Sequence, residues 1–330
     1  MSAAALVRAL KDPRWVAGLD GEGWNGLIAA ARAERLIGTL AWRIEDDTMP
    51  DAVRPILADA RGDAEREARQ ALWEADRAAD ALAGLEAPVV LLKGTAYAAA
   101  GLRAAEGRFI GDLDILVPRE VMKEVEKRLQ SAGWEWVKDD PYDDAYYRQW
   151  MHELPPMIHR ERDRMIDVHH TILPLTARQT PDAGAMLEEA VPITDGLFIL
   201  SPEDRVCHAV AHMLADGDLA GGLRNLWDIH CLLAEAEPAR LAERAARHGL
   251  AAHVRQARRL ADALYGDGGA RLGWWDRLIV ARLLARDGWG RERRKLLRLA
   301  FYIRSHWLRM PPVMLARHLL TKWRKGHRPV

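Results

Sequence analysis

The sequence predicts the α+β class, with a small mixed sheet embedded between N-terminal and C-terminal helical regions. Three observations support this prediction. Residues 1–86 carry apolar residues three and four positions apart, as amphipathic helices do. Short apolar runs of strand type alternate with helical segments over residues 87–200, and helical periodicity returns over residues 201–330. We therefore expect three domains with these bounds, the last ending in a basic, aromatic tail.

The N-terminal region is most clearly helical over residues 63–85. Gly84 and Pro88 mark the expected end of this helix, since glycine follows helix ends and proline interrupts them. The apolar stripe consists of Ala64, Ala68, Ala71, Leu72, Ala75, Ala79, Leu82 and Leu85.

The central region alternates strands and helices, which indicates a sheet with helical crossovers. Strands are expected at residues 89–92, 113–117, 134–137, 146–150, 157–160 and 165–169, and helices at residues 95–102 and 119–132. The segment Asp-Asp-Pro-Tyr-Asp-Asp at residues 139–144 predicts a polar turn.

The C-terminal region predicts helices at residues 203–215, 223–236 and 238–264, then a helical tail over residues 274–323 that is broken at Pro311-Pro312. The whole chain of 330 residues has no net charge. Residues 271–330 nevertheless contain 16 Lys or Arg and three Asp or Glu, a net charge of +13. Such a split predicts a basic face with a partner of its own.

Composition excludes several classes of protein. The two cysteines, Cys207 and Cys231, form no CxxC pair, so neither a disulfide scaffold nor a zinc site is indicated. No apolar stretch reaches the roughly 18–20 residues that cross a bilayer, and the N-terminus lacks the apolar core of a signal peptide. We therefore expect a cytoplasmic protein.

The segment Gly111-Asp112-Leu113-Asp114 begins an otherwise apolar strand. Alternate side chains of a strand share a face, so Asp112 and Asp114 lie together, about 7 Å apart. Two carboxylates at that spacing repel unless a cation lies between them, and divalent cations prefer oxygen ligands. The alternative is a solvated strand edge, which the apolar neighbours disfavour.

Upstream, Lys93-Gly94-Thr95 joins a strand to a helix, and we expect Gly94 to make the turn between them. Free N–H groups at a helix start favour phosphate, Lys93 adds a charge, and Thr95 can cap the helix or donate to a phosphate oxygen. An ordinary strand–turn–helix junction remains the alternative.

Downstream, Asp167 and His169 share one face of another strand. A third carboxylate on a neighbouring strand would complete a two-metal site, and Asp167 would help to remove the proton of an attacking hydroxyl. His169 would orient substrate or Asp167. The alternative for His169 is a polar strand residue with local hydrogen bonds.

These segments resemble the nucleotidyltransferase superfamily that includes DNA polymerase beta. More closely, they resemble an uncharacterised bacterial nucleotidyltransferase family with the pattern LLKG, then R-x-x-GD-[IL]-D-[IL]-LV, then VD-[LV]-H. This chain has LLKG at residues 91–94, RFIGDLDILV at 108–117 and IDVH at 166–169. LSPED at 200–204, HAVAH at 208–212 and LRNLWDI at 223–229 extend the resemblance, which covers roughly residues 85–235. The chain departs from the superfamily in having Gly94-Thr95 where Gly-Ser is usual.

The resemblance implies a metal-dependent enzyme that moves an NMP group from an NTP, such as ATP, to an acceptor and releases pyrophosphate. Two Mg²⁺ ions, or Mn²⁺ in their place, would be held by Asp112 and Asp114, with Asp167 on the ion that activates the nucleophile. The nucleotide would contact a second set of residues. That set is Lys93, Gly94, Thr95, Arg108, Gly111, His169 and Arg224.

Several alternatives stay open. Arg224 and Asp228 are four residues apart, so they can also form an ordinary helical surface pair. His208 and His212 have the spacing of metal ligands, but packing beside the core is the favoured interpretation.

The tail contains five tryptophans among basic residues: Trp274, Trp275, Trp289, Trp307 and Trp323. It fits RNA, an anionic membrane surface reached through residues 315–325, an acidic or phosphorylated acceptor, or helices that only pack. The acceptor is a small molecule, sugar, peptide or protein, or RNA. A non-catalytic nucleotide-binding protein on the same fold is the rival class.

Overall fold

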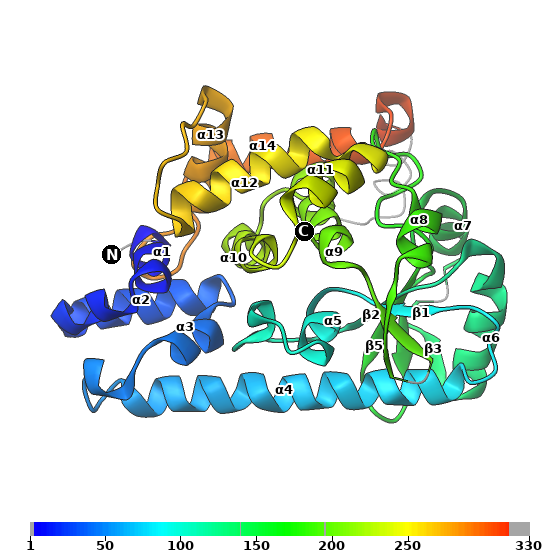
Figure 1. Cartoon of the computed structure of the whole chain (residues 1–330), viewed down its shortest axis with the longest axis horizontal. Helices are drawn as coiled ribbons and strands as arrows, with labels where there is room; N and C mark the ends of the chain where they lie inside the picture. The colour runs from blue at the N-terminus through cyan, green and yellow to red at the C-terminus, as the bar shows by residue number, and fades with distance from the viewer. Residues whose placement is uncertain (1–2, 139, 195, 317–330) are drawn as a thin grey trace.

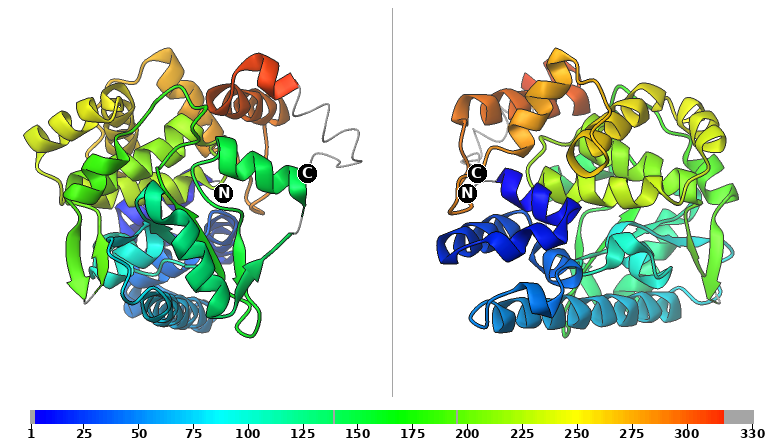
Figure 2. Two further views of the ribbon diagram at one scale, coloured as in Figure 1. Left: turned by 90° about the vertical axis from the view of Figure 1, so that its right-hand side faces the viewer. Right: turned by 60° about the vertical axis from the view of Figure 1, so that its left-hand side comes forward.

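The computed structural model describes residues 3–138, 140–194 and 196–316 (Figure 1). A seven-stranded mixed sheet lies between helices from the N-terminal and C-terminal parts of the chain, which confirms the predicted α+β class. Figures 1 and 2 both show the long helix α4 on one side of the molecule and helices α11 to α14 on the opposite side. One continuous apolar core joins these parts.

The sheet has the strand order β3-β4-β5-β2-β1-β7-β6. Two neighbouring pairs are parallel, β2 with β5 and β1 with β7, and the other pairs are antiparallel. The strands are β1 (Val89–Leu91), β2 (Leu113–Leu116), β3 (Trp134–Trp136), β4 (Met157–His159), β5 (Met165–His169), β6 (Val191–Thr194) and β7 (Leu197–Ile199).

Burial follows position in the sheet. Every residue of β1 and β2 is buried, as expected for central strands covered on both faces. The edge strand β6 is largely exposed and contains Pro192, which an edge tolerates because it needs no ladder hydrogen bond there. The Asp112–Asp114 segment therefore enters the sheet at its middle strand.

Four helices form the N-terminal part: α1 (Ala3–Lys11), α2 (Gly21–Ala33), α3 (Ile37–Arg43) and α4 (Arg54–Ala81). Helix α4 begins nine residues before the predicted start, with a proline in its first turn, where a missing N–H costs nothing. It contacts α3, α5 (Lys93–Ala99), α6 (Met122–Ser131) and β2.

The C-terminal part contains α8 (Ala183–Glu188), α9 (Pro202–Val210), α10 (Gly222–Leu233), α11 (Pro238–Arg247), α12 (Ala251–Tyr265), α13 (Trp274–Leu283) and α14 (Lys295–Arg309). Helix α9 continues into a π-helical turn, Ala211–Asp216. Gly249 has a φ of 66°, which ends the helix and divides the single helix predicted over 238–264 into α11 and α12. The predicted amphipathic segment 315–325 lies almost wholly outside the described residues.

One predicted strand is wrong. Residues 146–150 belong to the helix α7 (Pro141–Trp150), which also replaces most of the turn predicted at 139–144. The aromatic residues suggested a strand, but tertiary context overrides so short a propensity signal. The β6–β7 hairpin and α8 were not predicted, because three- and four-residue strands leave little periodicity to detect.

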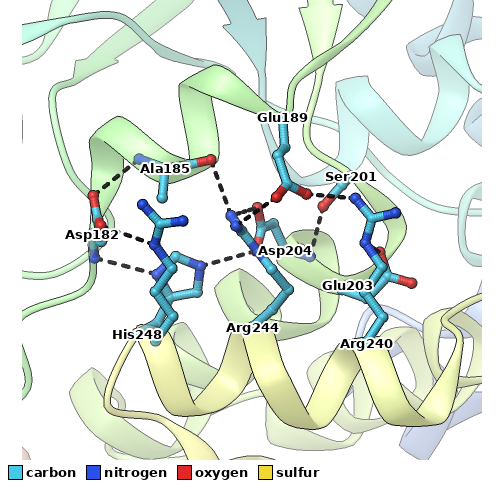
Figure 3. A network of polar contacts seen from close by, with 10 residues as sticks. Asp182, Ala185, Glu189, Ser201, Glu203, Asp204, Arg240, Arg244 and His248 are labelled. Carbon is cyan, nitrogen blue, oxygen red and sulfur yellow. Dashed lines mark hydrogen bonds and ion pairs between the residues drawn. The ribbon is translucent and has the colours of Figure 1, made fainter.

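A buried polar network attaches α11 to α9 and α8 (Figure 3). Arg244 donates to both oxygens of Asp204, at 2.9 Å and 2.5 Å, and His248 Nε2 lies 2.9 Å from Asp204 Oδ1. Asp204 and His248 are both fully buried.

No helix among the described residues is long and apolar enough to cross a membrane.

Candidate active site

The structure brings three aspartates together at the middle of the sheet. Asp114 on β2 is the register partner of Asp167 on the parallel neighbour β5, and Asp112 immediately precedes β2. One carboxylate oxygen from each lies within 4.8 Å of the others. We call these three residues the acidic cluster. Asp112 is exposed and Asp167 is half-buried, so solvent reaches the cluster.

Asp114 is held as a carboxylate. It is 2% exposed, with Lys93 Nζ 2.7 Å and His169 Nε2 3.0 Å from its Oδ1. Burial alone would raise its pKa, but the charge of Lys93 and the hydrogen bond from His169 outweigh burial and hold the pKa of Asp114 well below its usual range.

The surroundings of Asp167 shift its pKa in the opposite direction. Burial, followed by the negative charges of Glu153 and Asp114, raises the pKa of Asp167 to about 7. Its Oδ1 is buried and has no hydrogen-bond partner among the described residues. An unpartnered carboxylate oxygen beside two further carboxylates is the donor set that a hard divalent cation requires. The residues present therefore fit Mg²⁺ or Mn²⁺.

The junction before α5 differs from the sequence-based expectation. The left-handed residue is Lys93, with a φ of 48°, and not Gly94. Gly94 is needed for close approach, because a Cβ there would lie 2.8 Å from Arg108 Nε. Thr95 is 1% exposed and its Oγ1 has no hydrogen-bond partner among the described residues, so Thr95 does not cap the helix.

Arg108 and Arg224 converge on Asp228. Arg108 forms an ion pair with Asp228, and Arg224 Nη2 lies 2.6 Å from Asp228 Oδ1. Arg224 also donates to Thr39 Oγ1 at 2.6 Å. The i,i+4 pair of Arg224 and Asp228 thus exists, but it is buried and not on the surface. Contact of either arginine with a nucleotide stays a prediction.

Sequence reasoning missed two residues beside the cluster, His152 and Glu153. Glu153 Oε2 lies 3.4 Å from His169 Nδ1, and the His152 ring stacks on the His169 ring. The two residues lie beside the cluster because of an isolated antiparallel bridge between Glu153 and His169, which no local sequence pattern predicts. The adjacent His-Glu pair was the only sequence signal.

Of the remaining predicted groups, Gly111 precedes Asp112, and His208 and His212 lie near enough to Lys93 for its charge to act on them. Gly111 is exposed, and its carbonyl accepts a hydrogen bond from Arg164 at 3.2 Å. His208 is buried, and the described residues include no candidate metal group that contains His208 or His212. In the tail, Trp275 stacks on Phe301, while Trp274 and Trp289 are 74% and 75% exposed. Trp323 lies outside the described residues.

Comparison with known families agrees with this geometry. A family model described as "Uncharacterised nucleotidyltransferase" matches residues 20–266, about three quarters of the chain. The chain belongs to this family. The match includes the acidic cluster, Lys93 and the whole sheet, and it extends the resemblance seen in the sequence on both sides. It leaves out the basic tail, residues 271–330. A search of curated proteins finds no match.

Proposed function

We propose that this chain transfers an NMP group from an NTP to an acceptor hydroxyl or phosphate and releases pyrophosphate, with divalent cations held by Asp112, Asp114 and Asp167. The observation that carries the proposal is the charge imbalance of the acidic cluster. Asp167 has a pKa raised to about 7 and a buried oxygen without a partner, although Lys93 lies close by on Asp114. Bound Mg²⁺ or Mn²⁺ would stabilise the attacking and leaving oxygens of an in-line displacement.

The side chains around the cluster divide the remaining work. Lys93 and His169 hold Asp114 ionised and fix the direction of its oxygens. We assign Asp167, as a ligand of the ion that would activate the nucleophile, to help remove the proton of an attacking hydroxyl. Lys93, with Gly94 and Thr95 beside it, is the group that we assign to the triphosphate.

Arg108 is placed behind this junction. Its side chain occupies the space that a Cβ on Gly94 would need, and it is anchored by Asp228, which Arg224 also holds. We therefore propose that Arg108 holds the backbone at Gly94 in the position that binds the triphosphate. Gly111, immediately before Asp112, leaves room for the nucleotide because a Cβ there would meet no atom within 4 Å. A direct role for Arg224 at the base or phosphate is the weaker assignment.

The first candidate acceptor is a small molecule, sugar, peptide or protein. RNA is a second candidate, favoured by the exposed Trp274, Trp289 and Trp307 and by the excess of basic residues in the tail. An anionic membrane surface would engage the same charges. A salt titration of binding to RNA and to anionic vesicles separates these partners.

The test of transfer is incubation with each α-labelled NTP and Mg²⁺, with pyrophosphate release and labelling of the chain as readouts. We expect release with at least one NTP, and its loss when Asp114 is replaced by asparagine. Tight NTP binding without any release, by wild type and in the presence of Mg²⁺ or Mn²⁺ and candidate acceptors, would support the non-catalytic class instead.

A further inference from the structure

A second group of possible metal ligands lies next to the acidic cluster. His152, Glu153 and His169 each offer one ligand atom, and these atoms lie within 4.8 Å of one another. The group combines two imidazoles with one carboxylate, whereas the acidic cluster offers oxygen alone. Imidazole ligands suit zinc and similar transition metals, and all-oxygen sets suit Mg²⁺.

The distances match ligands that share one ion. Glu153 Oε2 lies 3.4 Å from His169 Nδ1 and 3.6 Å from His152 Nε2. Two ligands bound tetrahedrally to zinc at about 2.0–2.1 Å are separated by about 3.3–3.4 Å. Both measured distances are too long for good hydrogen bonds and close to this tetrahedral edge.

The orientation of the His169 ring also supports a metal ion at this group. Its Nε2 lies 3.0 Å from Asp114 Oδ1, so a proton on Nε2 is donated to a carboxylate. Nδ1 then faces the Glu153 carboxylate, and an ion bound between these two atoms would have one nitrogen and one oxygen ligand. Metal-bound histidines generally donate their second N–H to a carboxylate in this way.

The backbone holds these ligands in place without a metal. His170 N donates to His152 O at 2.9 Å, and Leu154 N donates to Val168 O at 2.9 Å. These two bonds flank the bridge between Glu153 and His169. The His152 and His169 rings stack with centroids 5.2 Å apart, and His152 Nδ1 is buried without a hydrogen-bond partner in the described part of the chain.

We propose that His152, Glu153 and His169 form a transition-metal site, separate from the acidic cluster, that takes Zn²⁺ with a fourth position left for water. The ion would fix the proton of His169 on Nε2, and thereby fix the hydrogen bond that orients Asp114. This proposal goes beyond nucleotidyl transfer, which depends on the acidic cluster and stands if the zinc site is absent.

The test uses the full chain, stripped with a chelator and titrated with Co²⁺ as a spectroscopic substitute for Zn²⁺. We expect one Co²⁺ with the intense visible bands of tetrahedral coordination, displaced by one equivalent of Zn²⁺. Glu153→Gln and His152→Ala should each weaken binding by more than about 100-fold, since loss of a ligand exceeds loss of its outer partner. His170→Ala, a neighbouring histidine outside the group, and Asp112→Asn should retain the bands.

Thermal unfolding of each variant in chelator verifies its fold. If His152→Ala is unstable, the near-isosteric Glu153→Gln tests the site by itself. Zn²⁺ should raise the Tm of wild type and Asp112→Asn but not that of Glu153→Gln. Equal Co²⁺ spectra for wild type and Glu153→Gln would overturn the proposal. So would loss of the bands in Asp112→Asn, because the ion would then belong to the acidic cluster.

Discussion

Asp204 and Asp167 are both carboxylates withdrawn from solvent, yet their surroundings differ completely. Asp204 has both oxygens paired, with Arg244 and His248 within 2.9 Å (Figure 3). Burial would raise its pKa, but hydrogen bonds from these partners lower the pKa below its usual value. Asp167 has a buried oxygen without a partner among the described residues, and its pKa is raised to about 7.

The difference separates a structural carboxylate from a candidate ligand. The Asp204 network connects three helices and pairs both oxygens of its buried carboxylate, so it stabilises the docking of α11. The acidic cluster adds Asp112 and Asp167 to an Asp114 that Lys93 already neutralises. An excess of partly buried negative charge costs stability unless a cation joins it, and functional sites accept that cost.

The largest expected effect is on chemistry at the acidic cluster. Asp114→Asn should lower the rate of pyrophosphate release by at least about 10³-fold, because it removes charge that would hold a cation at the reacting phosphate. The matched control is Asp59→Asn on the exposed side of α4, which should keep wild-type rates. A tenth or more of the wild-type rate in Asp114→Asn would remove Asp114 from the mechanism.

The next effect is on stability at the paired carboxylate. Asp204→Ala should reduce the free energy of unfolding by about 3–5 kcal/mol, because it removes the fully buried carboxylate that pairs with Arg244, whose remaining ion pair, with Glu189, is partly exposed to solvent. Urea denaturation measures this change. If Asp204→Ala destabilises the chain no more than an exposed Asp→Ala change does, the network of Figure 3 contributes little to docking.

A smaller effect is the pH dependence that Asp167 imposes in chelator. Its folded-state pKa of about 7 lies above the ordinary value of 3.8. Between these two pH values the folded chain therefore binds more protons than the unfolded chain. The contribution of Asp167 to the free energy of unfolding is complete below the unfolded pKa, and it is lost as pH rises through about 7. Asp167→Asn should remove about 2 kcal/mol of this decline between about pH 4 and about pH 8, after allowance for partial exposure.

The comparison that isolates Asp167 is the difference between the unfolding curves of wild type and Asp167→Asn. Histidines whose pKa values are lowered by burial act in the opposite sense, but both proteins share them. Identical pH profiles would show that Asp167 is not held in an unfavourable charged state.

The smallest effect concerns Gly94. Gly94→Ala should cost about 1 kcal/mol of stability, because the new Cβ forces Arg108 to move. If Arg108 supports the triphosphate site, KM for the NTP should rise several-fold while the Mg²⁺ dependence stays unchanged. Gly101→Ala is a useful contrast, since a Cβ there meets nothing within 4 Å and only its φ of 63° is strained.

The sequence predicted the fold class and the central strands well, because β1, β2 and β5 are apolar runs bounded by glycine, proline or charged turns. It also identified the aspartates at period two along those strands, and the structure brings them together. It could not predict His152 and Glu153, whose position depends on pairing with the end of β5. It placed the backbone turn at Gly94, whereas the residue with positive φ is Lys93 and Gly94 is needed for its close approach to Arg108.

The most direct test is a crystal structure of the chain with Mn²⁺ and a non-hydrolysable NTP analogue, read from the anomalous scattering of manganese. The account predicts manganese bound to the carboxylates of Asp112, Asp114 and Asp167, with the triphosphate on the same ions and near Lys93. Manganese bound elsewhere, with the Asp167 carboxylate left uncoordinated beside a bound nucleotide, would contradict it.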